Sequence, residues 1–362
     1  MKVKSLSLAI VVCTFQNAHN IESTIDSIEL STSNFFKRKL FLVDDSSTDE
    51  TCKKAKKVLK NKNLDFEIIE KDKNLGISHS RNIGISVSSE YELLTFVDGD
   101  DQLIKDAWIN FSEIDYESIS DLTLFSFNRL HLNGDLSLKR IREIKDNDGY
   151  ELYDLLLNYL RAPNKDYVFT FCWGRVYKRN ILNYVSFDEK LDNFEDLTFN
   201  VECFPFIKKI KSINEISYLY KENQPGKSLS INIKKTISRV LENNFFALNK
   251  IKHLIDNYEF SKKEKQILLN FLKHAKYAYI SIIMSREIPL RIKNISDYFS
   301  LCKEFKIFFL KNNVALLSRS YNNKYGKGPM LPLLASRLNL PYLAVFLWLI
   351  KDIKINKFTR KY

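Results

Sequence analysis

The stretch LLTFVDGDD, Leu93–Asp101, joins an apolar run to a segment with three acidic residues in four positions. A short apolar run that ends in polar residues is typical of a buried parallel strand, and ligands of such sheets bind beyond the carboxyl ends of the strands. Carboxylates this close repel one another, and a divalent cation removes that cost. Oxygen-only ligands favour Mn²⁺ or Mg²⁺, so the stretch predicts a metal-bound diphosphate, with a solvated acidic turn as the alternative.

The residues before this stretch alternate between apolar runs and helical periodicity. The pattern predicts strands at 6–14, 40–43, 66–69 and 93–97 and helices at 20–30, 51–60 and 77–87. Such alternation predicts an α/β fold with a mostly parallel central sheet and helices on both faces.

The chain after residue 110 shows a different pattern. We expect a strand at 121–132 with a hairpin turn at Asn133-Gly134, a helix at 150–160, short helices within 170–184 and 195–206, and a strand at 213–220. After Gln224-Pro225-Gly226 the chain reads as helical, at about 234–256, 261–286, 293–311 and 331–350. We therefore expect an α-helical C-terminal region.

Composition bounds the class of protein. The 362 residues are 45% hydrophobic, enough for a real core, which excludes a disordered chain. Five scattered cysteines without a CxxC pair form neither a disulfide framework nor a zinc ribbon and predict reduced thiols. Neither a secretory signal nor an apolar run long enough to span a bilayer is expected.

The charge of +12 is unevenly distributed. Residues 1–227 carry a net −5 and residues 228–362 a net +17, which predicts a first domain at 1–227 and a basic helical domain at 228–362. The basic domain favours an anionic partner. Leu331–Ile350 is apolar and precedes a basic tail, which predicts either attachment to the inner, cytoplasmic face of the cell membrane, or a buried terminal helix or homo-oligomer contact. Nucleic acid is disfavoured, because no recognisable nucleic-acid motif accompanies the charge.

Two more polar clusters follow predicted strands, at Cys13–Asn17 and Asp44–Asp49. No Walker loop or GxGxxG motif is present, so other residues must bind a nucleotide. Phe15 could stack on a base, and Asp44 or Asp45 could accept the imide N–H of uracil. The alternatives are a core aromatic for Phe15 and a helix cap for Asp45.

Four sequence blocks together resemble the ordered signature of family-2 inverting glycosyltransferases with the GT-A fold. The blocks are VVCTFQN (11–17), LVDDSSTD (42–49), NLGISHSRNIG (74–84) and FVDGDD (96–101). The resemblance covers residues 6 to about 225 and is strongest over 6–110. One departure is Phe15-Gln16-Asn17, where Tyr-Asn is common in the family.

The resemblance implies a role for each matching residue. The residues that would line the nucleotide are Thr14, Phe15, Asp44, Asp45, Asn74, Gly76, Arg81, Asp98 and Gly99. Phe15 would lie against the base and Asp45 would bind it, while Asp98-Gly99-Asp100 would be the DxD motif. Within that motif Asp98 would face the ribose or sugar, and Asp100, with Asp98, would hold the metal. A surface salt bridge is the alternative for Arg81.

An inverting transfer needs a base on the face of the sugar opposite the leaving diphosphate. Glu195-Asp196 enters a predicted helix and is similar to the Glu-Asp motif of the family, which implies Asp196 as the base and Glu195 as the second choice. A favourable helix N-terminus is the alternative for this pair. Trp173 belongs to a segment that resembles the family's tryptophan segment and could stack on an acceptor sugar, or else be a core tryptophan.

These observations predict a metal-dependent enzyme that transfers a sugar from a nucleotide donor, with a UDP-sugar favoured, to a glycan or lipid-linked glycan. The resemblance and the Lys-, Asn- and Ile-rich composition imply synthesis of a bacterial surface polysaccharide such as capsule or lipooligosaccharide. A sugar nucleotidyltransferase of related fold and a non-catalytic glycan- or membrane-binding module are the alternatives.

Overall fold

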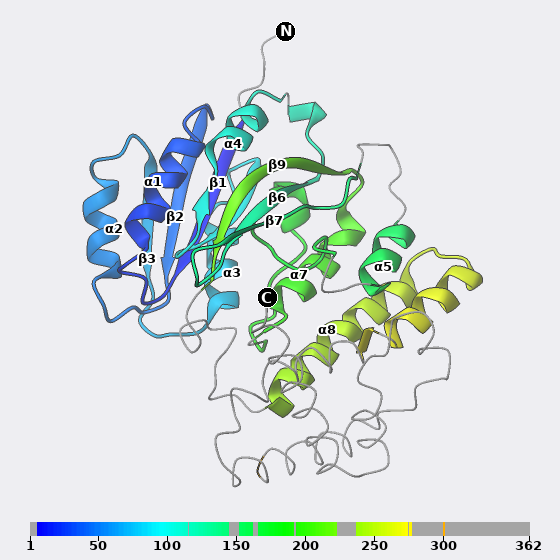
Figure 1. Ribbon diagram of the computed structural model, residues 1–362. Coiled ribbons are helices and arrows are strands. Elements are labelled where there is room, and N and C mark those ends of the chain that lie inside the picture. The colour runs from blue at the N-terminus through cyan, green and yellow to red at the C-terminus, as the bar shows by residue number, and fades with distance from the viewer. Residues whose placement is uncertain are drawn as a thin grey trace. The chain divides into compact units, whose positions relative to one another are not determined.

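The computed structural model describes residues 6–114, 116–144, 152–161, 166–191, 193–222, 237–273, 275–276 and 300. The chain divides into two compact units, Met1–Gln224 and Pro225–Tyr362 (Figure 1).

The first four strands form a parallel half-sheet in the order β3-β2-β1-β4. Their bounds are β1 Ser7–Thr14, β2 Lys37–Asp44, β3 Asp65–Glu70 and β4 Leu93–Asp98. Thr14 pairs with Asp44 and Cys13 with Asp98, so the carboxyl ends of three strands meet at one edge. This register confirms the expected sheet and brings the three polar clusters to that edge.

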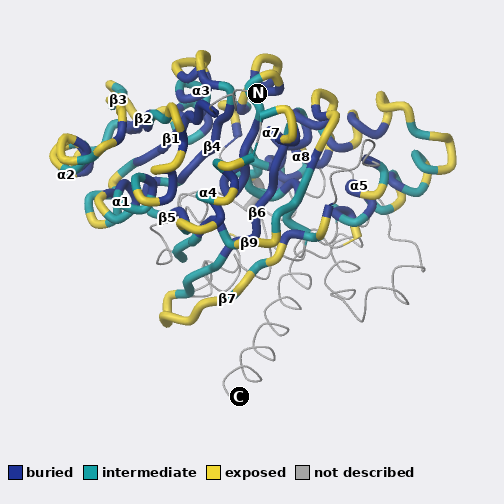
Figure 2. The backbone as a smooth tube through the Cα atoms, turned by 90° about the horizontal axis from the view of Figure 1, so that it is seen from above, coloured by how far each residue is buried: buried dark blue, intermediate teal, exposed yellow. Residues whose placement is uncertain are grey.

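Three helices connect these strands and cover both faces, namely α1 Ile21–Ser31, α2 Thr51–Leu59 and α3 Ile77–Val87. Leu8, Ile10 and Val12 of β1 share one core cluster with apolar residues of α1 and α2. On the other face α3 packs so closely that a Cβ on Gly84 would lie 2.2 Å from Cγ1 of Val11. Because both faces are covered, every residue of β1 is buried, and its sequence is continuously apolar from Leu8 to Cys13 (Figure 2).

The rest of the sheet is mixed and continues from β4 in the order β8-β6-β9-β5, with β7 paired to β6. Its strands are β5 Gln102–Leu103, β6 Leu122–Leu130, β7 Leu136–Lys139, β8 Arg175–Lys178 and β9 Ile210–Lys221. The β6–β9 pairing is long and parallel, whereas the antiparallel pairings are short. The sheet as a whole is therefore mostly parallel, as the sequence predicts.

The remaining helices of this unit lie between and beside these strands. They are α4 Lys105–Ser112, α5 Leu152–Arg161, α6 Arg179–Leu182 and α7 Glu195–Cys203, with 3₁₀ turns at Tyr116–Ser118 and Phe204–Phe206. The hairpin at Asn133-Gly134 is confirmed. The expectation of only short helices within 170–184 is wrong, because β8 lies there and pairs with β4 and β6.

The described part of the second unit is helical. Helix α8 spans Ile237–Asn257, and a further helical segment covers 262–273. Ser261 and Glu264 exchange backbone-to-side-chain hydrogen bonds at the start of that segment, which is a capping box. The end of the helix expected at 261–286, the helix expected at 293–311 apart from residue 300, the helix expected at 331–350, the basic tail and the Gln224–Gly226 break lie outside the described residues. Among the helices that the structure describes, none combines the length and apolarity needed to cross a membrane.

Candidate active site

The DxD loop follows β4 and is fixed from two sides. The Gly99 N–H donates to the carbonyl of Cys13 (2.9 Å), and a Cβ on Gly99 would lie 2.6 Å from Oγ1 of Thr14. Asp101 is buried, and its oxygens accept hydrogen bonds from the Tyr218 hydroxyl and the Lys221 N–H, both at 2.8 Å. Glycine is thus required at position 99 because the loop lies against β1. The hydrogen bonds of the buried Asp101 join the loop to β9.

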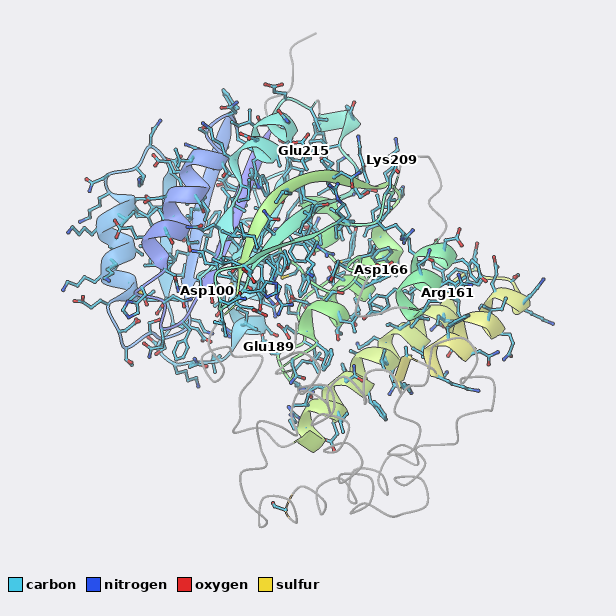
Figure 3. The ribbon with its side chains drawn as sticks, viewed as in Figure 1. Asp100, Arg161, Asp166, Glu189, Lys209 and Glu215 are labelled. Atoms are coloured by element: carbon cyan, nitrogen blue, oxygen red, sulfur yellow. The ribbon has the colours of Figure 1, made fainter. Side chains whose placement is uncertain are left out.

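The three acidic residues of the loop, Asp98, Asp100 and Asp101, therefore lie in different environments. Burial, and then the charges of Asp100 and Asp98, raise the pKa of Asp101 well above its ordinary value. Burial, and then Asp100 and Asp196, raise the pKa of Asp98 to about 6, although Arg81 opposes this. Asp100 is half-buried at the lower end of the sheet in Figure 3, where Glu189 is also labelled. Asp98 and Asp100 remain as candidate ligands, and Asp101 is structural.

Arg81 of α3 is the charged centre of the site. Its side chain is 3% exposed, and it contacts three carboxylates: Nη1 is 2.5 Å from Oδ1 of Asp196 and 3.3 Å from Oε1 of Glu195, and Nη2 is 3.1 Å from Oδ1 of Asp98. Burial by itself would lower the pKa of Arg81, but the nearby negative charges, Asp196 foremost, raise it. The surface salt bridge considered from sequence is excluded, and the DxD motif and the predicted base share one buried guanidinium.

The Glu195-Asp196 pair begins α7. The preceding residue, Phe194, has a φ of +63°, a conformation that costs a non-glycine residue free energy. Oδ2 of Asp196 accepts a hydrogen bond from the Cys172 N–H (3.2 Å), so both oxygens of Asp196 are oriented. Burial, and then the charge of Asp196, raise the pKa of Glu195 to about 7, against the effect of Arg81. Two adjacent carboxylates thus have different environments, as acid–base sites require.

Asp45, predicted to bind the nucleotide base, instead fixes the loop that leads into α3. Its Oδ1 accepts from Lys71 Nζ (2.5 Å) and the Leu75 N–H (2.9 Å), and its Oδ2 accepts from the Gly76 N–H (2.9 Å). Gly76 has a φ of +91°, which favours glycine at the entry to α3, and Asn74 is exposed on the same loop. The structure therefore places Asp45, Asn74 and Gly76 together.

The end of β1 contacts the loop after β2. Asp44 is buried and accepts hydrogen bonds from the N–H and hydroxyl of Ser47 (2.7 and 2.6 Å), so it closes its own loop. Gln16 then bonds Ser47 through its backbone N–H (2.8 Å). Thr14 is buried and accepts a hydrogen bond from Asn17, while Phe15 is half-buried between them in sequence. These contacts give Asp44 a structural role and leave Phe15 accessible for stacking.

Trp173 does not fit the predicted acceptor contact. Its side chain is 4% exposed, and the rings of Phe171 and Tyr218 stack on it at centroid distances of 4.2 and 4.5 Å. A residue covered in this way has no face left for an acceptor sugar, so the core tryptophan considered from sequence is the one found.

The residues around the DxD motif fit a hard divalent cation as a partial ligand set. Arg81 contacts Oδ1 of Asp98, while Oδ2 accepts no hydrogen bond from the described residues, and Asp100 lies beside it. Within those residues no group of three His, Cys, Asp or Glu side chains is arranged around one metal position. Mn²⁺ or Mg²⁺ commonly completes its shell with water and phosphate oxygens, so two carboxylates suit it.

Sequence reasoning missed three contributors to the site: Lys71, Tyr218 and the Cys172 N–H. Tyr218 donates to Asp101 and also accepts from the Asp98 N–H (3.1 Å). Lys71 directly follows β3, which pairs with β2. The order of the strands could therefore have placed Lys71 beside the loop after β2. A backbone N–H gives no sequence signal, so the Cys172 contact could not have been found.

Comparison with known proteins places these features in a family. The model of "Glycosyl transferase family 2" matches residues 9–111, which include β1 to β4 and the DxD loop. A curated "Cholesterol galactosyltransferase" of Borreliella burgdorferi is 24% identical over 88% of this chain and 91% of its own length. A "Poly(ribitol-phosphate) beta-glucosyltransferase" of Bacillus spizizenii is 25% identical over 62% of this chain, which spans about a third of that relative (34%).

Solved structures show the same fold. The crystal structure of S. aureus TarS 1-349 in complex with UDP-GlcNAc superposes with a TM-score of 0.65 at 18% identity, over 97% of this chain and 92% of that chain. The same fragment with UDP gives a TM-score of 0.62. At this identity the match describes the fold alone.

Proposed function

The chain belongs to the family-2 glycosyltransferases with a GT-A fold, and from that premise we propose that it is an inverting enzyme. In this proposal it moves a sugar from a UDP-sugar to a hydroxyl of a glycan or lipid-linked glycan, with Asp196 as the base. Two related proteins, named a poly(ribitol-phosphate) beta-glucosyltransferase and a teichoic acid poly(glycerol phosphate) polymerase, support a bacterial surface glycan as the product.

The observation that carries the proposal is the ion-pair cluster of Arg81. It joins Asp98 of the donor motif to Asp196 of α7, although 115 residues separate Arg81 from Asp196. A base must lie within reach of the acceptor hydroxyl while that hydroxyl faces the anomeric carbon of the donor. Because Asp98 and Asp196 are both bonded to the planar guanidinium of Arg81, that group fixes the distance between the two carboxylates.

The residues would then act in order. Asp196, oriented by Arg81 and the Cys172 N–H, accepts the proton of the attacking hydroxyl. Asp98 and Asp100 would hold Mn²⁺ or Mg²⁺, which when bound neutralises charge on the leaving diphosphate. Attack in line inverts the anomeric centre and converts an α-linked donor into a β-linkage.

The donor site in this proposal comprises the β1 and β2 loops. Phe15 offers a half-buried ring for a base, and the loop that Asp45 and Lys71 fix carries Asn74 and Gly76. The Asp45 carboxylate acts mainly through this loop, since both of its oxygens already accept hydrogen bonds. Stacking tolerates several bases, so the preference for uracil rests on the resemblance and on the related structures solved with UDP and UDP-GlcNAc.

Release of UDP tests the proposal. The full chain is incubated with Mn²⁺ and each of UDP-glucose, UDP-galactose and UDP-N-acetylglucosamine, and UDP is measured with a coupled assay. We expect one donor to be turned over, and chelation by EDTA to stop the reaction. Absence of turnover, with no thermal stabilisation by any of the three donors, would overturn it.

The membrane assignment is a separate part of the proposal and rests on the net +17 of residues 228–362. Sedimentation with vesicles of anionic and of neutral phospholipid tests it. Binding to anionic vesicles should weaken as salt is raised, because the attraction is electrostatic.

A further inference from the structure

Between α5 and β8 the chain makes an irregular turn, residues 167–172, which belongs to neither a helix nor a strand. Because the turn has no backbone ladder of its own, its carbonyl groups need other donors. Two buried side chains, Arg175 of β8 and Asn200 of α7, supply most of them. The acceptors are the carbonyls of Tyr167 and Val168 for Arg175 (3.2 and 3.1 Å) and those of Phe169 and Phe171 for Asn200 (3.0 and 2.9 Å). Buried side chains therefore set the shape of this turn.

Asn200 is completely buried, and both polar atoms of its side chain have two partners each. Nδ2 donates to the two carbonyls of the turn, and Oδ1 accepts hydrogen bonds from the Tyr177 hydroxyl (2.8 Å) and from Arg175 (3.2 Å). These bonds use both donors and both lone pairs of the amide. A buried amide of this kind is firmly placed, because any movement would leave a polar group without a partner.

One of these bonds connects Asn200 to the base. The carbonyl of Phe171 and the N–H of Cys172 belong to the same planar peptide group, in which they point in opposite directions. The carbonyl accepts from Asn200 (2.9 Å), and the N–H donates to Oδ2 of Asp196 (3.2 Å). Asp196 and Asn200 lie about one turn apart on the same face of α7. Helix α7 therefore holds both ends of this peptide group.

The orientation of the peptide group decides what faces Asp196. As found, its N–H, the positive end of the group, faces the carboxylate and stabilises the charged form that accepts a proton. A reversed peptide would place its carbonyl oxygen against the carboxylate, and the two negative groups would repel each other. Arg81 bonds the other oxygen of Asp196, and its hydrogen bonds within the described residues include none to this peptide. Asn200 thus supplies a hold on the peptide that Arg81 does not.

We propose that Asn200 is a positioning residue for the base. It holds the Phe171–Cys172 peptide with its N–H toward Asp196, and so fixes the direction in which that carboxylate meets the acceptor hydroxyl. The inference rests on the proposed function and deepens it. Asn200 acts through the peptide group and does not touch the substrate.

Asn200→Asp separates positioning from stability. The new carboxylate has nearly the same size as the amide and would pair with Arg175, which contacts no carboxylate among the described residues. It would also turn an oxygen, in place of an N–H, toward the carbonyl of Phe171, so the hold on the peptide is lost. The matched control is Asn158→Asp on α5, because Asn158 also donates to a backbone carbonyl (Asp154, 2.8 Å).

UDP release in the presence of Mn²⁺ and each of the three UDP-sugars gives kcat and KM for every protein. Calorimetric titration with UDP counts the intact sites, and kcat is expressed per site, so that a partly unfolded variant is not mistaken for a slow one. We expect Asn200→Asp to unfold close to the wild-type temperature and to lose about tenfold to a hundredfold in kcat, with KM and UDP affinity unchanged. Asn158→Asp should match the wild type in all of these quantities.

Wild-type kcat in Asn200→Asp would overturn the inference. A rise in KM and a loss of UDP affinity in parallel with kcat would overturn it too, because they would indicate a general change of the site. If Asn200→Asp does not fold, Tyr177→Phe decides: it removes one bond to Oδ1 of Asn200 and should lose about threefold in kcat at unchanged KM, and an unchanged kcat would overturn the inference. Failure of the proposed function is distinct, because then the wild type and the Asn158→Asp control would release no UDP either, and the inference would fall with it.

Discussion

The parallel half of the sheet and the mixed half hold their functional carboxylates in different ways. At the end of β2, Asp44 accepts hydrogen bonds from the N–H and hydroxyl of Ser47, and Asp45 accepts them from two backbone N–H groups and from the buried Lys71, 26 residues away. In α7, Glu195 and Asp196 face a guanidinium from α3, more than 110 residues away in sequence. The end of β2 is thus organised by contacts that span at most 31 residues, whereas the geometry of the base depends on one charge more than 110 residues away.

The largest effect should come from the base itself. Asp196→Asn keeps the shape of the side chain and removes its ability to accept a proton, so kcat should fall by about 10²–10⁴-fold. Donor binding, measured by thermal shift with the UDP-sugar, should remain. Asp154→Asn on the exposed surface of α5 is the matched control and should keep full activity. Transfer by Asp196→Asn at more than a tenth of the wild-type rate would contradict the assignment.

The link between the two halves can be broken at Arg81. Arg81→Met leaves three carboxylates without their buried partner and should destabilise the fold by about 3 kcal/mol or more. Arg81→Lys keeps the charge but not the planar fork, so it should fold and lose about tenfold or more in kcat. Both quantities are measured by thermal unfolding and by UDP release.

Arg179→Lys is the control for this pair, because Arg179 bonds a carbonyl (Ile85, 2.7 Å) and a hydroxyl, with no carboxylate contact among the described residues. It should retain transfer. Equal kcat for wild type and Arg81→Lys would show that sugar transfer does not depend on the planar guanidinium of Arg81.

The donor half should respond to a backbone change. In Gly99→Ala the new Cβ would meet Oγ1 and Cβ of Thr14 at 2.6 and 2.8 Å, so the DxD loop must move away from β1. We expect a loss of about 1–3 kcal/mol in stability and an increase of about tenfold in KM for the donor. Gly134→Ala, where no atom lies within 4 Å and only the φ of +87° is unfavourable, should leave KM unchanged. An unchanged KM in Gly99→Ala would mean that the loop is not part of the donor site.

The two halves also differ in what their sequences reveal. The strands of the parallel half are covered on both faces, so each reads as an apolar run, and its loops carry recognisable motifs. In the mixed half, β8 has only four residues, Arg175–Lys178, too few to show a period of two, and short helices were expected there. The burial of Trp173 and the ion pairs of Arg81 arise from contacts between distant segments, which no local pattern encodes. Motifs therefore identified which residues form the site, but not which of them touch.

The smallest expected effect concerns the charge of Glu195, and it tests how the electrostatics of α7 contribute to stability. Because burial and Asp196 raise its pKa to about 7, the folded protein binds a proton there that the unfolded chain has already lost above its ordinary pKa of 4.5. The folded state therefore binds more protons between pH 4.5 and 7, so Glu195 costs stability as the pH rises through that window, and the cost is complete above pH 7. Glu195→Gln lacks this titration and should gain about 1–3 kcal/mol relative to wild type between pH 5 and 8, measured by urea unfolding at each pH. Glu202→Gln, at a half-buried position of the same helix, is the control and should track the wild-type curve. A constant difference between Glu195→Gln and wild type across that range would show that Arg81 already compensates the Glu195 charge, and that the two carboxylates of α7 share one environment.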